Sequence, residues 1–179
     1  MNRKYIVAAA VTFVLAAALT GLLRWVVREP AVRFSEEEAF QEEAFELTLR
    51  CGLSGGTIRY TLDGSDPTMQ SRIYEGPIPI EAGLPEKVTV VKAAVFQNGE
   101  PGKICTQTYF VGKGVSELFD VMVVSLSADE KVLYDEETGI LANYGEEGEN
   151  GEWDRPAYVE FYEPDGTRML AQGTGIAIS

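Results

Sequence analysis

The sequence contains no histidine in its 179 residues. This absence excludes the Ser-His-Asp and Cys-His nucleophile systems, and it removes one of the two usual zinc ligands. The patterns that remain are weak. Gly173-Thr174-Gly175 lacks the third glycine and the following helix of a phosphate-binding loop. Asp63, Ser65 and Asp66 do not have the spacing of a calcium-binding loop. We therefore assign no catalytic, cofactor-binding or metal-binding residue in this chain.

Positive charge is also scarce, because 15 Lys and Arg face 28 Asp and Glu and leave a net charge of −13. A field of this sign repels nucleic acid and anionic lipid, so we expect no nucleic-acid partner. Glu152 and Asp154 flank Trp153, and Glu136 and Glu137 supply two further carboxylates earlier in the same block. They could indicate acid-base chemistry or sugar binding, but we prefer a solvated loop with one buried tryptophan.

The longest apolar run lies at the amino-terminal end. After Arg3 and Lys4, residues 5–23 carry no charge, and Trp25-Val26-Val27 follow. A helix of this length spans about 30 Å of hydrocarbon, which predicts a single-pass membrane anchor. A cleaved signal peptide is the alternative, with Ala16-Ala17-Ala18 as its cleavage region. We favour an uncleaved anchor over residues 1–29, with the bulk of the chain outside the cell membrane.

The densest strand and turn pattern lies in residues 55–80. Ile58, Tyr60 and Leu62 alternate with polar residues, which predicts a strand with one face on a core. Asp63-Gly64 and Asp66-Pro67 then predict a long turn of defined conformation, because Gly64 can adopt a positive φ and the ring of Pro67 fixes the φ angle of that residue. Two short extended pieces follow, over residues 72–74 and 77–80.

These residues carry a family resemblance. The string T-x-R-Y-T-x-D-G-S-D-P-T, followed by S-x-x-Y-x-G-P-I-x-I, resembles the fibronectin-III-associated module, also called the chitobiase/β-hexosaminidase C-terminal-like domain. The resemblance covers roughly residues 34–112. It implies a small accessory β-sandwich of the kind often appended to extracellular enzymes, and it implies no catalysis. The motif residues are Tyr60, Asp63, Gly64, Asp66, Pro67 and Tyr74.

Within this region we expect strands over residues 45–50, 57–62, 88–96 and 104–111. In a fibronectin-III-like topology, Cys51 and Cys105 then lie at strand ends near the same pole. Outside the membrane a disulfide between them would persist and would stabilise the fold by about 4 kcal/mol. Two buried thiols remain the alternative, because strand assignment does not supply the Cα separation that a disulfide needs.

The pattern changes after a short hinge at Gly112-Lys113-Gly114. Residues 121–124 are all apolar, which predicts a strand buried on both faces. One helical turn over residues 129–133, capped by Ser127, and a flexible acidic loop over 146–151 follow. Residues 157–163, the turn Pro164-Asp165-Gly166 and residues 168–178 predict a β-hairpin.

This second block resembles the opening of the spore-coat CotH kinase-like family. The matching strings are Val124-Ser125-Leu126, then L-x-D-x-E-T-G-I, then E-W-x-R-P-A-x-V-E-F, with Trp153, Arg155 and Pro156 as motif residues. The nucleotide-binding and metal-binding residues of that family lie further along, so we expect a fragment of the amino-terminal lobe. A complete parent would be an atypical protein kinase-like enzyme, but no catalytic residue can be assigned here.

The expected fold is mainly β, in three parts. Residues 1–29 form a membrane helix, 30–112 a fibronectin-III-like β-sandwich and 113–179 a partial α+β lobe with a β-hairpin. Two functions are compatible with this organisation. The first is a membrane-anchored extracytoplasmic protein whose sandwich precedes an incomplete kinase-like region, with no cofactor in this chain. The second is a cell-surface module that binds glycan or protein through the aromatic rings of Tyr74, Tyr109 or Trp153.

Overall fold

The computed structural model describes residues 31–52, 55–85, 87–143 and 155–176. The expected membrane anchor at residues 1–29, Trp153 and the acidic loop at 146–151 lie outside these ranges. No helix within the described ranges is long and apolar enough to cross a membrane.

One layer of the fold consists of two short antiparallel ladders. The first pairs β1 (Arg33–Phe34) with β4 (Leu49–Arg50), and the second pairs β3 (Phe45–Leu47) with β7 (Ile78–Ile80). The single strand expected over residues 45–50 is thus divided at Thr48 into β3 and β4. Thr48 lies where the chain leaves one ladder for the other, and its N–H donates to Ser35 Oγ.

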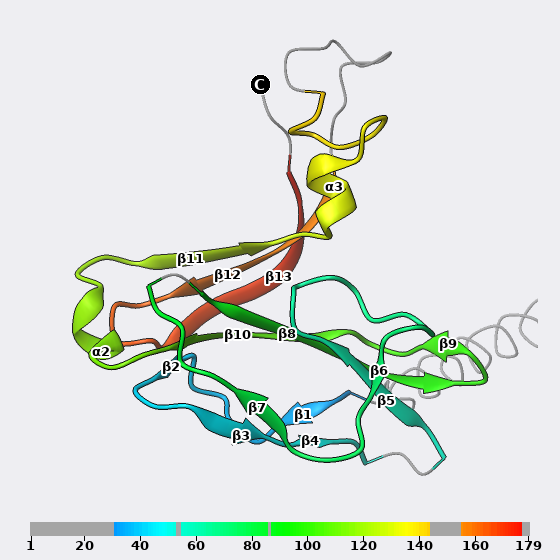
Figure 1. Cartoon of the computed structure of the whole chain (residues 1–179), viewed down its shortest axis with the longest axis horizontal. Coiled ribbons are helices and arrows are strands. Elements are labelled where there is room, and N and C mark those ends of the chain that lie inside the picture. Colours follow the sequence, from blue (N-terminus) through cyan, green and yellow to red (C-terminus); the bar gives the residue numbers. More distant parts are fainter. Residues whose placement is uncertain (1–30, 53–54, 86, 144–154, 177–179) are drawn as a thin grey trace, which may run out of the picture. The chain divides into compact units, whose positions relative to one another are not determined.

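The second layer is a six-stranded sheet with the order β2-β10-β8-β5-β6, and β9 pairs with β8 at the side of this path (Figure 1). Only the β2–β10 pair is parallel. The strands are β2 (Phe40–Gln41), β5 (Thr57–Thr61), β6 (Arg72–Ile73), β8 (Thr89–Gln97), β9 (Glu100–Pro101) and β10 (Cys105–Val111).

The main apolar core lies between these two layers. Alternate residues of β8 point into it, so Val91, Ala93 and Val95 are buried beside Tyr109 and Val111 of β10. The opposite layer contributes Leu47, Leu49, Ile78 and Ile80. Ile58, Tyr60 and Leu62 pack against the same core, which confirms the face predicted from their alternation.

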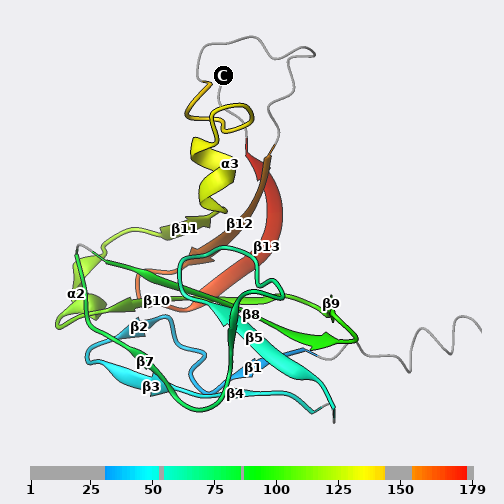
Figure 2. The ribbon, with the colours of Figure 1, turned by 45° about the vertical axis from the view of Figure 1, so that its right-hand side comes forward.

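A second, separate three-stranded sheet covers the other face of β8 and β10. This sheet and the six-stranded sheet are the two sheets referred to below. The three-stranded sheet has the order β11-β12-β13 and is antiparallel throughout, with strands β11 (Val123–Ser127), β12 (Arg155–Tyr162) and β13 (Arg168–Ile176). Two short helices, α2 (Val115–Leu118) and α3 (Glu130–Tyr134), flank β11. Residues 31–179 form one compact unit, in which β11–β13 lie over β8 and β10 and curve away from them toward α3 (Figures 1 and 2).

The second sheet confirms one prediction and corrects two. The hairpin is present as β12 and β13, whose turn closes where Gly166 N–H donates to the Glu163 carbonyl. The strand expected at residues 121–124 is not buried on both faces, because Val121 is 72% exposed and β11 begins only at Val123. Asp129, rather than Ser127, caps α3 by accepting a hydrogen bond from Lys131 N–H.

Candidate functional site: a cleft between the two sheets

The two sheets are joined first by aromatic rings. Phe110 of β10 and Tyr162 of β12 meet with ring centroids 5.8 Å apart, and Phe40 lies 5.3 Å from Phe110 in an edge-to-face arrangement. Phe119 completes this group, which we call the aromatic cluster. Edge-to-face pairs of this kind stabilise packing beyond the apolar area that they bury.

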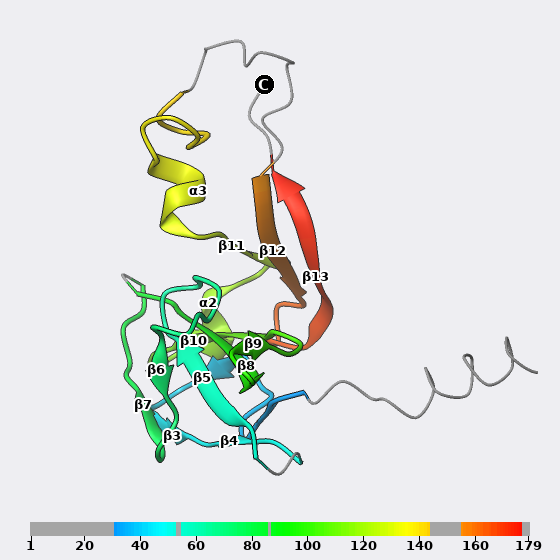
Figure 3. The ribbon, with the colours of Figure 1, turned by 90° about the vertical axis from the view of Figure 1, so that its right-hand side faces the viewer.

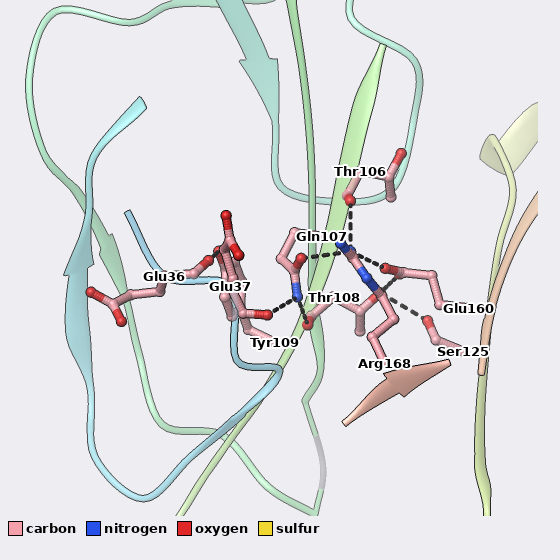
Figure 4. A network of polar contacts seen from close by, with 9 residues as sticks. All are labelled: Glu36, Glu37, Thr106, Gln107, Thr108, Tyr109, Ser125, Glu160 and Arg168. Carbon is pink, nitrogen blue, oxygen red and sulfur yellow. Dashed lines mark hydrogen bonds and ion pairs between the residues drawn. The ribbon is translucent and has the colours of Figure 1, made fainter. Parts of the chain in front are cut away.

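Next to the aromatic cluster lies a polar network centred on Glu160 (Figure 4). The Glu160 side chain is 1% exposed, yet both of its carboxylate oxygens accept hydrogen bonds. Thr108 of β10 donates to Oε2, and Arg168 of β13 donates to Oε1 at 3.2 Å. Because the Thr108 proton points to Glu160, the Ser125 hydroxyl at 2.9 Å donates to Thr108. A buried charge is tolerated only with such partners.

The same network continues along the edge of β10. Strand β2 pairs only with Phe110 and Val111 of β10, so the segment before them is open to Arg168. Arg168 Nη1 donates to Gln107 Oε1 at 2.6 Å and to the Thr106 carbonyl at 3.4 Å. The Gln107 amide in turn donates to the Glu37 carbonyl. Arg168 therefore contacts both sheets.

A cleft of about 600 Å³ opens where the two sheets diverge. Its walls come from β8, β10, β12 and β13, from the loop after β5 and from the segment that leads into α3. They include Asp66, Lys92, Ile104, Thr106, Asp129, Val132, Pro156, Tyr158 and Gly173. The volume lies within the range of about 300–1,000 Å³ that is usual for small-ligand sites.

Lys92 is the charged group inside this cleft. Its side chain is only 7% exposed, and its Nζ lies 2.8 Å from Asp66 Oδ1 and 5.9 Å from the centroid of the Tyr158 ring. The carboxylate attracts the ammonium group, and the ring face adds a cation–π contact. The Asp66 side chain is 64% exposed, so the ion pair lies between the cleft and solvent.

Two hydroxyl groups lie beside Lys92. Thr106 Oγ1 is buried and makes no hydrogen bond of ordinary length within the described residues. Burial, and next the charge of Glu160, raise the pKa of Tyr158 above its usual value of 10, while the charge of Arg168 and a side-chain hydrogen bond with Thr106 act in the opposite direction. The Tyr158 hydroxyl therefore keeps its proton at neutral pH and can donate it to a ligand.

The turn after β5 supports one side of the cleft. Ser65 donates to Asp63 Oδ1 through its N–H at 3.0 Å and its hydroxyl at 2.6 Å, which lowers the pKa of Asp63. Gly64 has a φ of 82°, and a Cβ built there would lie 3.2 Å from the Ser127 Cβ. The turn thus needs glycine at this position, and it places Asp66 next to Lys92.

Comparison with known families supports part of the resemblance. Residues 47–109 match a family model described as Fn3 associated. We refer to these residues as the Fn3-associated region, which contains β5, β8 and most of β10. No curated protein matches the chain. The accessory β-sandwich is therefore supported by both the fold and the family match.

The motif residues of the Fn3-associated region have structural positions. Tyr60 and Tyr74 are half-buried against the main core, and the Tyr74 N–H donates to the Ile58 carbonyl. Pro67 is buried behind the turn, whereas Asp66 reaches the cleft. Of these motif residues, Asp66 therefore has the clearest position for contact with a ligand.

Among the other expected site residues, Tyr109 is placed against the prediction that it stacks on a ligand. Tyr109 is fully buried, its hydroxyl donates to the Glu36 carbonyl at 2.7 Å, and burial raises its pKa, so its ring cannot stack on a ligand. Arg155 Nε donates to the Thr138 carbonyl, and Pro156 lies at the cleft wall. Trp153 lies outside the described residues. Within those residues no group of three His, Cys, Asp or Glu side chains is placed to hold a metal ion.

The expected disulfide is not formed. Cys51 and Cys105 both pack against the main core as thiols, and Cys105 Sγ lies 3.9 Å from the Lys103 carbonyl oxygen. Cys51 follows β4, while Cys105 begins β10 in the opposite layer. Position at a strand end was not sufficient, because a disulfide also requires a specific Cα separation and orientation.

Sequence reasoning did not single out Lys92, Thr106, Glu160 or Arg168. A signal was present for Lys92, since it interrupts the apolar run Val90-Val91-Lys92-Ala93-Ala94 and must therefore find a partner if the strand is covered on both faces. Glu160 lies between Val159 and Phe161 as a solvent-facing strand residue does, Thr106 lies in a polar run with Gln107 and Thr108, and Arg168 follows the turn. No signal in the sequence separates them from ordinary surface positions.

Proposed function

We propose that this chain is a non-catalytic accessory module on an extracytoplasmic, membrane-anchored protein. In this proposal the Fn3-associated region holds the β11–β13 sheet in one orientation and acts as a spacer. The observation that carries the proposal is the buried Glu160 network, which connects β10, β11, β12 and β13 through Thr108, Ser125 and Arg168. A flexible joint would not need a desolvated carboxylate with this many fixed partners.

The spacer role can be tested by measuring the relative orientation of the sheets in solution. Residual dipolar couplings of backbone amides in the full chain should fit one alignment tensor for β8 and β12 together. Amides of β5 serve as an internal control, because β5 pairs directly with β8. If β8 and β12 require two different tensors while β5 fits the tensor of β8, the joint is flexible and the proposal is rejected.

The membrane anchor rests on the apolar run from Tyr5 to Leu23. Its charge-free length favours insertion into a bilayer, and the acidic remainder is suited to an aqueous exterior. Membrane fractionation with amino-terminal sequencing tests this part. Recovery in the membrane fraction with residues 1–29 retained supports it, whereas a soluble product beginning near Leu19 supports a cleaved signal peptide.

The kinase-like resemblance of residues 121–179 also enters here as a proposal. It places the β11–β13 sheet at the opening of an amino-terminal lobe whose catalytic residues lie elsewhere. The family match extends over residues 47–109 and does not include this segment. Calorimetric titration of the full chain with ATP and Mg²⁺ should give no saturable binding, and micromolar affinity would contradict the proposal.

A further inference from the structure

We propose that the cleft between the two sheets binds an uncharged sugar residue of a glycan. The inference goes beyond the spacer role and does not depend on it. It also concerns a different place from the aromatic side chains expected from the sequence. Three observations carry it: a cleft of about 600 Å³, an ion pair at its wall whose Lys92 end is buried, and a buried Thr106 hydroxyl that makes no hydrogen bond of ordinary length within the described residues.

The charges at the cleft disfavour an anionic ligand. The single cation among its lining residues, Lys92, is already paired with Asp66 at 2.8 Å. Asp129 adds a further carboxylate to the wall, and the whole chain carries a net charge of −13. A phosphate or a carboxylate would have to compete with Asp66 for Lys92 against this field. A neutral ligand meets no such repulsion.

The polar atoms of the cleft suit hydroxyl groups. Thr106 is 7% exposed, and within the described residues its Oγ1 has no partner except the nearby Tyr158 hydroxyl, so a ligand that both donates and accepts would satisfy it. Tyr158 can donate, Lys92 has donors beyond the one directed to Asp66, and the carboxylates of Asp66 and Asp129 can accept. Sugar hydroxyl groups match this mixture of donors and acceptors, whereas a purely apolar ligand would leave it unpaired.

The remaining walls are apolar and suit the C–H faces of a sugar ring. Ile104, Val132 and Pro156 supply this surface. Gly173 pairs with Tyr158 across β12 and β13, so a side chain at position 173 would project on the same face as the Tyr158 ring. A Cβ built at Gly173 meets no atom within 4 Å. This glycine therefore leaves space in the cleft that a larger residue would occupy.

The experiment uses the full chain, purified in a detergent without a sugar headgroup. The probes are four uncharged oligosaccharides, cellotriose, maltotriose, xylotriose and triacetylchitotriose, and the anionic trigalacturonate, each titrated by calorimetry and by saturation-transfer-difference NMR. We expect at least one uncharged probe to bind saturably. Thr106→Val should weaken that binding at least about fivefold, the equivalent of one lost hydrogen bond. Gly173→Leu should weaken it at least as much, because the leucine side chain would occupy the space of the ligand.

Matched controls separate loss of the site from loss of the fold. Gly52→Leu and Thr57→Val make the same changes at exposed positions that do not line the cleft, and they should leave binding unchanged. Amide NMR spectra of all variants should retain the wild-type dispersion. Absence of binding by all four uncharged probes would overturn the inference. So would binding that Gly173→Leu leaves unchanged, or tighter binding of trigalacturonate than of every uncharged probe.

Discussion

At the scale of single residues, the loss of the Glu160–Arg168 ion pair has different consequences for its two partners. The Glu160 side chain is 1% exposed, whereas that of Arg168 is 34% exposed. Water can therefore solvate the guanidinium if the pair is broken, but it cannot reach the carboxylate without moving one sheet. Removing one partner of a buried pair costs more than the pair contributes, because a desolvated charge is left behind. Arg168 is accordingly the more sensitive position to change.

We expect Arg168→Met to lower the free energy of unfolding by about 3 kcal/mol, since it leaves Glu160 buried with hydroxyl partners alone. Urea unfolding of the full chain measures this change. In a Glu160→Gln background the same substitution should cost less than about 1 kcal/mol, because no charge then needs compensation. Arg50→Met, at an exposed position on β4, controls for the lost charge. Equal costs in both backgrounds would contradict the mechanism.

A second prediction at this scale concerns Gly64 in the motif turn. Gly64→Ala should destabilise the protein by about 1–2 kcal/mol, because alanine is strained at a φ of 82° and its Cβ would crowd Ser127. Gly76→Ala is the matched control, since its backbone has no positive φ and nothing lies within 4 Å of an added Cβ. Thermal unfolding followed by circular dichroism compares the two. Equal midpoints for both variants would contradict a structural role for Gly64.

At the scale of secondary-structure elements, the alternation of apolar and polar residues predicted the two faces of a strand. It did not predict which part of the protein covers each face. In β5 this alternation correctly identified Ile58 and Tyr60 as facing the core. The prediction succeeded because their face packs against the apolar residues of the β1–β4 and β3–β7 ladders. In β12 the alternation is also present, but the buried face is that of Glu160 and Tyr162. Which face is buried is decided by the partner sheet, and a sequence of alternating residues does not specify that partner.

The same limit explains why the cleft was not predicted. Thr106, Thr108 and Lys92 lie on the face of β10 and β8 opposite the main core, a face that in an isolated sandwich would be exposed to water. Only the docking of β11–β13 makes these side chains buried. The polar residues of the turn after β5 were predictable because their hydrogen bonds are local, as in the bonds from Ser65 to Asp63.

One side-chain cap joins two short elements that lie far apart in the sequence. Glu42, just after β2, accepts hydrogen bonds from Gly114 N–H at 2.6 Å and from the N–H and hydroxyl of Ser116 at 3.3 and 3.0 Å. These bonds, with that from Gly114 first, hold the pKa of Glu42 below its ordinary value of 4.5. Glu42 thereby connects β2 to the beginning of α2.

This cap predicts a pH-dependent stability. Because the pKa is lowered in the folded protein, the contribution of Glu42 is present above pH 4.5 and is lost as the pH falls below that value. The difference in unfolding free energy between wild type and Glu42→Gln should therefore be largest near neutral pH and shrink in acid. Urea unfolding over this pH range measures it, with Glu43→Gln as a control for net charge. A difference that does not change with pH would exclude the cap.

At the scale of the whole molecule, residues 31–179 form one compact unit, with contacts across the segment near residue 112 that the sequence predicts to be a hinge. The aromatic cluster joins Phe40 and Phe110 to Tyr162, and the Glu160 network joins Thr108 to β12 and β13. Figure 3 shows the β12–β13 hairpin standing above β8 and β10. A domain boundary between residues 112 and 113 stays a prediction from the sequence. The contacts nevertheless indicate how strongly the two sides should be coupled.

We expect the two sides to unfold together, because separating them would expose the aromatic cluster and the buried Glu160 charge at once. Native-state hydrogen exchange of the full chain tests this by comparing amides of Val91 in β8 and Val159 in β12. Their opening free energies should agree within about 1 kcal/mol, and both should fall by the same amount in Arg168→Met. If Val159 opens at a much lower free energy than Val91, the second sheet unfolds alone. In that case Arg168→Met would lower the protection of Val159 only, and the boundary near residue 112 would separate two independently unfolding parts.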